Sequence, residues 1–254
     1  MEDLEKMTTD KKRWYIFEDT SFEGRPRSKW IIDCLLGDIQ TFFDGIENFI
    51  KNKEKSGKRD GGGNLSVPIL ISTALEFVAA LYTGKTKYQT KKEGEKLNIY
   101  EKYNATDNVR KFIKDFFPKE YKDIPLLLWD GVRNGLVHSF YPKSFSFQRS
   151  SQRSERYIQF QFYVEDKNIS SRFKKDKDTI WICINVFELY RVVKKAIEDY
   201  LDKLKHDETL QDRFIKAWSS VEYYRDKADP DQWGEIKKLL DYLDSNSDAP
   251  ILRE

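Results

Sequence analysis

The stretch LLLWDGVRNGLVHSFYP, residues 126–142, combines an apolar helical pattern with a cluster of polar side chains. Within nine residues it places four groups that can bind a ligand or move a proton: Asp130, Arg133, Asn134 and His138. At 3.6 residues per turn, Asp130, Asn134 and His138 fall on one stripe of a helix. The sequence therefore predicts a helix, called here the motif helix, with polar chemistry along one side.

The opposite side of the motif helix should face the core through Leu126, Trp129, Leu136 and Phe140. Arg133 lies about 140° round from His138 on a regular helix. Because Pro142 cannot continue a helix, His138 should belong to its last turn or so. A helix end that loosens there would let Arg133 and His138 converge on one ligand.

The segment RNGLVH, residues 133–138, resembles the Arg-polar-x-x-x-His signature of the HEPN superfamily of all-helical domains. Many members are metal-independent endoribonucleases of toxin–antitoxin, abortive-infection and CRISPR-associated systems. The resemblance implies a helical bundle in which Arg133, Asn134 and His138 are catalytic. It also implies a homodimer that pairs two copies of the site through the motif helix, and an antitoxin as a candidate partner. The specific likeness is confined to residues 126–142.

Two glycines, Gly131 and Gly135, stand four residues apart on the motif helix, where each costs about 1 kcal/mol relative to alanine. The apolar periodicity runs through both of them, so they are not turn signals. A pair of positions without side chains leaves a shallow groove that another backbone can approach. This groove serves either tight packing within one chain or a contact between subunits.

Apolar residues at helical spacing predict further helices along the chain. They cover residues 28–50, with Ser28 as the cap, then 67–82, closed by Gly84, and 106–117, capped by Thr106 and stopped by Pro118. After the motif helix, Asn185 and Glu188 have the spacing of a capping box for a helix that runs to Leu204. Two more amphipathic helices are expected near 210–224 and 232–243. The aromatic cluster at residues 14–17 is expected to be a short strand.

Between the motif helix and residue 186 the apolar period changes from helical to alternating. Residues 158–164 and 180–186 alternate, with a charged link between them, so they predict an antiparallel β-hairpin. Residues 145–147 are a candidate third strand. The expected fold class is mainly α: a HEPN-like multi-helix bundle with a β-hairpin inserted after the motif helix. The expected divisions are an N-terminal segment 1–28, a helical domain 29–206 with the hairpin near 145–186, and a C-terminal helical extension and tail 207–254.

Charge is unevenly spread along the 254 residues, although the net charge is only +2. Residues 207–254 hold 7 basic and 12 acidic residues, whereas residues 143–177 hold 9 basic and 4 acidic ones. A basic surface is what a phosphate backbone requires. The candidate nucleic-acid-binding residues are Lys143, Arg149, Arg153 and Arg156. Solvated loops are also often basic, and that alternative stays open.

Several classes of protein find no support in the sequence. Two histidines cannot form a three-histidine zinc site, and no paired cysteines, nucleophile elbow or Gly-Lys-Ser/Thr phosphate loop is present, so neither a metal nor a cofactor is expected. Cys34 and Cys183 lie in apolar patterns typical of buried thiols. No apolar run reaches the 18 or more residues of a membrane span, and the first residues have no signal-peptide layout. We expect a cytoplasmic protein without a membrane segment.

Glu76 is the one charge in the otherwise apolar helix at 67–82, and a charge in a buried helix needs a partner. Arg133 or His138 would be a functional partner, and a nearby lysine a structural one. Glu76 and Asp130 are therefore supporting candidates for the site.

Arg133 and His138 are compatible with RNA cleavage, because RNA supplies its own nucleophile, the 2′-OH. An imidazole with a pKa near 6.5 can remove or return the proton, and a guanidinium can hold the phosphate oxygens. The hypothesis is a metal-independent ribonuclease acting on single-stranded RNA, with His138 as acid or base, Arg133 on the phosphate and Asn134 orienting one of them.

Three alternatives remain at this point. The fold could be a non-catalytic dimerisation or nucleic-acid-binding module. The chain could instead be a DNA-binding protein that uses Arg25, Arg27 or residues 143–177. In the third alternative Arg133 simply pairs with Asp130, three residues back, and His138 donates to a carbonyl at the helix end.

Overall fold

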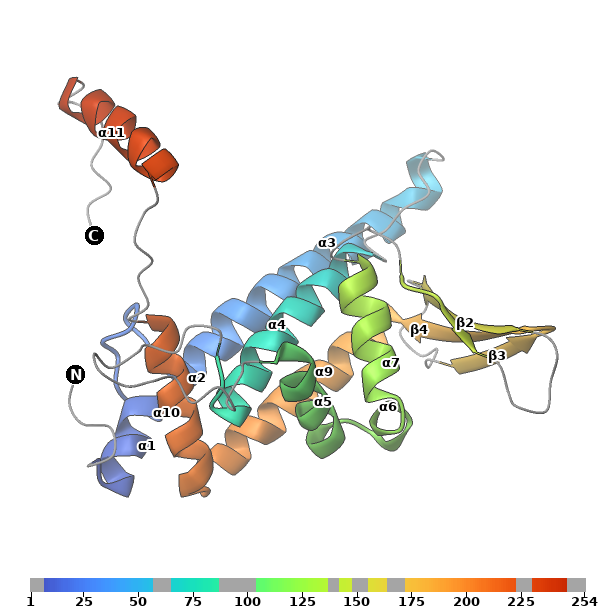
Figure 1. Ribbon diagram of the computed structural model, residues 1–254, viewed down its shortest axis with the longest axis horizontal. Coiled ribbons are helices and arrows are strands. Elements are labelled where there is room, and N and C mark those ends of the chain that lie inside the picture. The colour runs from blue at the N-terminus through green and yellow to red at the C-terminus, as the bar shows by residue number, and fades with distance from the viewer. Residues whose placement is uncertain are drawn as a thin grey trace.

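The computed structural model describes residues 7–56, 65–86, 104–136, 142–147, 155–163, 172–222 and 230–245. Over these residues the chain is mainly helical, with a small four-stranded sheet at one end of the helices (Figure 1). The expected fold class is confirmed at this level. The identity of the bundle as HEPN-like stays a prediction.

The first long helix runs without a break from Arg27 to Ser56. It consists of α2 (Arg27–Trp30), a π-helical segment η2 (Ile31–Leu36) and α3 (Gly37–Ser56). Pro26, with extended backbone angles, stands at its start, one residue before Arg27 and two before the expected cap, Ser28. The apolar spacing predicted this helix correctly.

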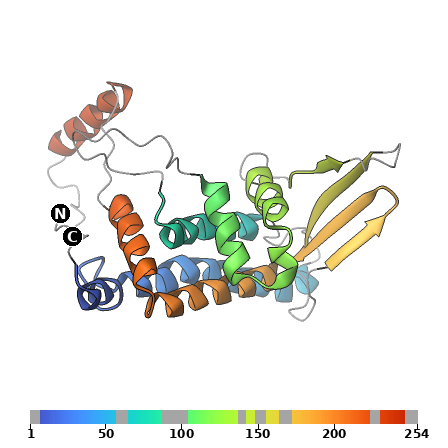
Figure 2. The same cartoon turned by 60° about the horizontal axis from the view of Figure 1, so that its bottom comes forward.

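The central helix α4 (Ser66–Thr83) ends at Gly84, whose φ of 71° is left-handed and therefore favours glycine. Most of α4 is buried in the core (Figure 2). Among the described residues it is the one helix long and apolar enough to cross a membrane, yet 61% of it is buried inside the protein. Burial of this kind is typical of the core helix of a soluble protein.

Several helical elements lie between α4 and the sheet in the described part of the chain. Helix α5 (Ala105–Phe116) begins at Asn104, whose side chain accepts hydrogen bonds from the backbone of Thr106 and Asp107, so Asn104 is the cap rather than Thr106. Helix α6 (Lys119–Lys122) then leads to α7 (Pro125–Trp129), which has proline in its first turn and continues into a π-helical turn, η3 (Asp130–Asn134).

The sheet contains β1 (Phe145–Phe147), β2 (Arg156–Tyr163), β3 (Arg172–Asp176) and β4 (Thr179–Asn185), in the order β1-β2-β4-β3. The two alternating runs are strands, as predicted, and β1 is the third. However, β2 and β4 pair in parallel, with Ile158 opposite Ile180 and Phe160 opposite Ile182, so the predicted hairpin between them is wrong.

The antiparallel partner of β4 is β3, which lies inside the charged link. Strand β3 is an edge strand, and its Phe173, Lys174 and Lys175 are exposed. An edge strand with polar side chains on both faces has no alternation of apolar residues, and this is why the sequence pattern missed it.

Helix α9 (Val186–Leu204) starts at Asn185, whose side chain accepts from the backbone N–H of Glu188 at 3.1 Å, as the predicted capping box requires. Helices α10 (Glu208–Glu222) and α11 (Pro230–Ser245) follow, and α11 lies apart from the other helices in both views (Figures 1 and 2).

The expected strand at residues 14–17 is wrong, because these residues belong to α1 (Thr9–Phe17). Ile16 and Phe214, outside the expected 29–206 domain, are part of the same hydrophobic core.

Arg27 is a buried cation that joins the N-terminal region to α10. Its side chain is 1% exposed, and its guanidinium lies 2.7 Å from Asp19, 3.2 Å from Glu222 and 3.7 Å from the centroid of the Tyr15 ring. Burial raises the pKa of the Asp19 carboxyl, but hydrogen bonds from Ser21 and Arg27 outweigh it and hold that pKa below its ordinary value. Arg27 is therefore not available to read DNA, which removes it from the DNA-binding alternative.

Replacing Arg27 with alanine should lower the free energy of unfolding by about 3–5 kcal/mol, because Asp19 and Glu222 would be left without their common cation. Urea unfolding measures the change. Arg25→Ala is the matched control, since the Arg25 side chain is 40% exposed and should contribute no more than about 1 kcal/mol. Equal losses in the two variants would contradict a structural role specific to Arg27.

Candidate functional site

The motif helix is anchored in the core by its apolar side. Trp129 and Leu136 are 3% and 0% exposed, as predicted. Leu126 is 45% exposed, so its predicted place in the core is wrong; it lies in the first turn of α7, on the outer side. Phe140 and His138 fall outside the described residues, since the described part of this helix ends at Leu136.

Arg133 is held between two helices. Its Nη2 donates to Oε2 of Glu76 on α4 at 3.2 Å, and its Nη1 donates to Oδ1 of Asn134 at 3.1 Å. The guanidinium carbon lies 5.9 Å from the centroid of the Trp129 ring. The side chains of Arg133 and Glu76 are 28% and 26% exposed, so the pair is half-buried with one side open to solvent.

Glu76 forms an ion pair with Arg133. Of the partners that the sequence analysis offered, this is one of the two candidate site residues and not a nearby lysine. The pairing answers the need of a carboxylate in an apolar helix, because an opposite charge offsets the cost of burying it. It also fixes the direction in which Arg133 points.

Asp130 is bonded on both carboxylate oxygens. Asn134 Nδ2 donates to Oδ1 of Asp130, four residues back, and Lys143 Nζ lies 2.9 Å from Oδ2. These hydrogen bonds, first from Lys143 and then from Asn134, lower the pKa of the Asp130 carboxyl. The alternative in which Arg133 pairs with Asp130 is wrong: Arg133 pairs with Glu76, and Asp130 bonds Asn134 and Lys143. Asp130 and Asn134 do share one stripe, as predicted.

Of the four candidate nucleic-acid-binding residues, Lys143 lies at the motif helix. Its backbone N–H donates to the carbonyl of Gly131 at 3.0 Å, and its ammonium bonds Asp130. Arg156 begins β2, and its Nε is buried with no hydrogen-bond partner among the described residues. Arg149 and Arg153 fall outside the described residues. The link between Asp130 and Lys143 was not predicted, because no helical spacing connects residues 13 apart.

Gly131 is used for packing inside the chain. A Cβ on Gly131 would lie 2.2 Å from Cε2 of Phe160 on β2, well inside van der Waals contact. Because Gly131 has no side chain, the motif helix can contact the sheet at this position. Gly131 therefore serves packing within the chain and not a contact between subunits. Gly135 is also buried.

Together these contacts form a continuous polar chain from Glu76 through Arg133, Asn134 and Asp130 to Lys143. We call these five residues the polar chain. It holds two cations and two carboxylates, with both cations reaching the surface. Such an arrangement can bind an anion through Arg133 and Lys143 while the carboxylates hold the cations in place.

Within the part of the chain that the structure describes, no group of three histidine, cysteine, aspartate or glutamate side chains could hold a metal ion. The searches against protein-family models, curated proteins and solved structures found no match to this chain.

Substituting alanine for Gly131 should destabilise the protein by about 1–3 kcal/mol, because the added methyl group collides with the Phe160 ring. Thermal or urea unfolding measures the loss. Gly45→Ala is the matched control: Gly45 is exposed within α3 with nothing near its missing Cβ, and the change should stabilise by about 0.5–1 kcal/mol. A Gly131→Ala protein as stable as the wild type would mean that the helix and the sheet are not in contact there.

Proposed function

We propose that this chain is a metal-independent endoribonuclease of the HEPN type that acts on single-stranded RNA, in a toxin or phage-defence setting. The observation that carries the proposal is the half-exposed Arg133 guanidinium, fixed by Glu76 and Asn134 in the segment that also contains His138. Lys143 supplies a second cation beside it.

Arg133 would act on the scissile phosphate. A guanidinium presents its N–H donors in a planar fork that matches phosphate oxygens, and the Arg133 side chain is 28% exposed. Because Glu76 and Asn134 hold it in place before the substrate arrives, little reorganisation is needed when negative charge builds up in the transition state. Lys143 would neutralise a neighbouring phosphate of the RNA backbone.

His138 would carry the proton transfer. The 2′-oxygen attacks the adjacent phosphorus, and the bond between phosphorus and the 5′-oxygen breaks. The proton leaves the 2′-OH and another returns to the 5′-oxygen, so the products are a 2′,3′-cyclic phosphate and a 5′-OH. One imidazole in its ordinary range can serve as the base or as the acid at neutral pH.

A second copy of the chain would complete the set of groups. One arginine and one histidine are few for both proton transfers, and a homodimer would bring two of each together. The exposed Leu126 on the outer side of α7 gives a second copy an apolar side chain to cover. An antitoxin that binds the same face is the corresponding proposal for a partner.

The alternative function is a non-catalytic HEPN-like module for dimerisation or nucleic-acid binding. One observation favours it: Arg133 already has Glu76 and Asn134 as partners, so it could serve only to join the motif helix to α4. A variant that keeps this join but loses the guanidinium separates the two functions.

The test is incubation of the purified protein with end-labelled single-stranded RNA in excess EDTA. We expect cleavage that leaves 5′-OH ends, and a loss of at least about 100-fold in rate for His138→Ala and for Arg133→Lys. Arg133→Lys keeps a cation for Glu76, so a fall in rate without a fall in melting temperature assigns Arg133 to the reaction.

The controls are Arg110→Ala and His206→Ala, which replace an exposed arginine and the chain's other histidine. Both should cleave at the wild-type rate. Cleavage that is lost on chelation, or that survives in His138→Ala, would contradict the proposal. RNA binding without any cleavage would support the non-catalytic module.

A further inference from the structure

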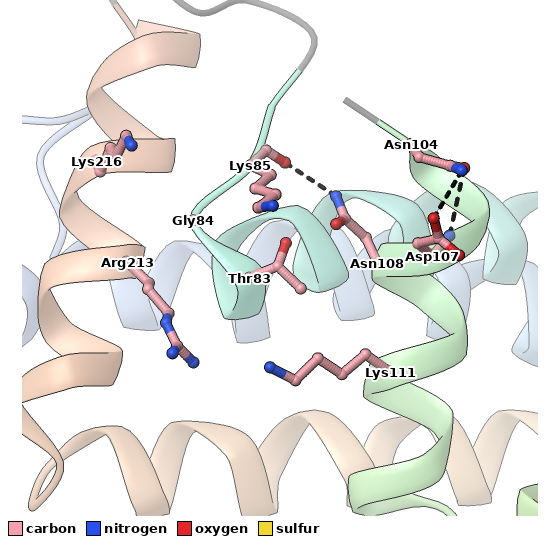
Figure 3. Close-up of a pocket in the computed structure, with 9 residues that line it drawn as sticks. All are labelled: Thr83, Gly84, Lys85, Asn104, Asp107, Asn108, Lys111, Arg213 and Lys216. Carbon is pink, nitrogen blue, oxygen red and sulfur yellow. Dashed lines mark hydrogen bonds between the residues drawn. The ribbon is translucent and has the colours of Figure 1, made fainter. Parts of the chain in front are cut away.

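A second polar site lies at the C-terminal end of α4, away from the polar chain. There a pocket of about 450 Å³ opens between the end of α4, the first turns of α5 and the side of α10 that faces them (Figure 3). Thr83 at its edge is seven residues beyond Glu76, which is about 10 Å along a helix. The pocket and the candidate nuclease site are therefore separate.

Four cations from three parts of the chain line this pocket: Lys85, Lys111, Arg213 and Lys216. Figure 3 shows Lys111 and Arg213 extending toward one another from α5 and α10 across the hollow. In the described ranges none of the four forms an ion pair, and Asp107 is the one acidic residue in the lining. Like charges gathered in this way repel one another, so an anion between them would be stabilised.

The carboxylate of Asp107 is engaged elsewhere. Asn104 Nδ2 donates to Asp107 Oδ2 at 2.8 Å, and Arg110 lies 3.9 Å from its other oxygen. Asp107 therefore completes the cap of α5 instead of neutralising the cations. Among the described lining residues, cations therefore outnumber carboxylates by four to one.

The walls of the pocket are held by specific contacts. Gly84, with its positive φ, lies so close to α10 that an added Cβ would be 3.0 Å from Cβ and Cγ of Arg213. Asn108 Nδ2 donates to the carbonyl of Lys85 at 3.0 Å, which ties the segment after α4 to α5. The ammonium of Lys111 lies 5.5 Å from the centroid of the Tyr82 ring. The stem of Arg213 and the ammonium of Lys111 are thus held in contact with the walls of the pocket.

We propose that this pocket binds a small phosphate-bearing molecule, of the class of nucleoside di- and triphosphates. Its volume falls within the roughly 300–1,000 Å³ of ligand sites, so a single small molecule fits better than a polymer. Arginine can hold a phosphate through two parallel hydrogen bonds, and lysines add point charges around it. Asn108 and Thr83 also line the pocket, but they donate to the carbonyls of Lys85 and Ala79 and so help to shape its wall.

No pattern in the sequence marks these residues. They come from the end of α4, the first turns of α5 and, more than 100 residues further along the chain, α10, and only the fold brings them together.

The test is isothermal titration of the full-length protein with ATP, ADP, AMP and adenosine in EDTA. We expect affinity to fall as phosphates are removed, adenosine not to bind, and pyrophosphate to compete with ATP. The double variant Lys111→Gln, Arg213→Gln should weaken ATP binding at least about 10-fold. The Arg213→Gln change retains Cβ and Cγ, so the contact with Gly84 survives.

The matched control is Lys114→Gln with Lys195→Gln, which removes the same charge from exposed positions outside the pocket and should leave the affinity unchanged. Absence of ATP binding, equal binding of adenosine, or an equal loss in both double variants would overturn the proposal. So would a single-stranded RNA that binds through Lys111 and Arg213 more tightly than any nucleotide. Arg133→Lys should bind ATP normally, so the result does not depend on nuclease activity.

Discussion

The ion pair between Glu76 and Arg133 is the interaction on which the arrangement of the candidate site depends. Glu76 belongs to α4, the most buried helix described, where a carboxylate without a partner would cost free energy. Arg133 belongs to the motif helix, and its bond to Glu76 at 3.2 Å ties the two helices together. Because both side chains keep about a quarter of their surface exposed, the pair positions the guanidinium without sealing it inside the protein.

The motif helix is held from its other side by the sheet. Gly131 admits the Phe160 ring of β2, and the chain after Pro142 returns so that Lys143 bonds both the Gly131 carbonyl and Asp130. Asp130 and Gly131, which make these contacts, both belong to the π-helical turn Asp130–Asn134. Turns of this kind often occur at functional sites, since they displace side chains from regular helical positions. The polar chain is therefore built from α4, the motif helix and the segment just before β1.

Local signals in the sequence predicted most helices, because caps and apolar spacing act over a few residues: Asn185 bonds Glu188, and Gly84 ends α4 with a left-handed φ. Contacts between residues far apart in the sequence could not be predicted from these local signals. The parallel pairing of β2 with β4 depends on the charged edge strand β3, which has no apolar alternation. The sequence offered Arg27 as a candidate for binding DNA, whereas its side chain is buried against Asp19 and against Glu222, which is 195 residues away. In the site, the helical spacing predicted that Asp130 and Asn134 share one stripe. The contact of Lys143 with Asp130 could be seen only in the structure.

A double-mutant cycle on Glu76 and Arg133 tests most directly whether these two residues hold the motif helix to α4. The free energy of unfolding would be measured for wild type, Glu76→Gln, Arg133→Gln and the double variant. We predict a coupling of at least about 0.5 kcal/mol, with the double variant less destabilised than the sum of the single changes. Additive effects, within about 0.3 kcal/mol, would mean that the two side chains do not interact and that Arg133 is positioned by something else.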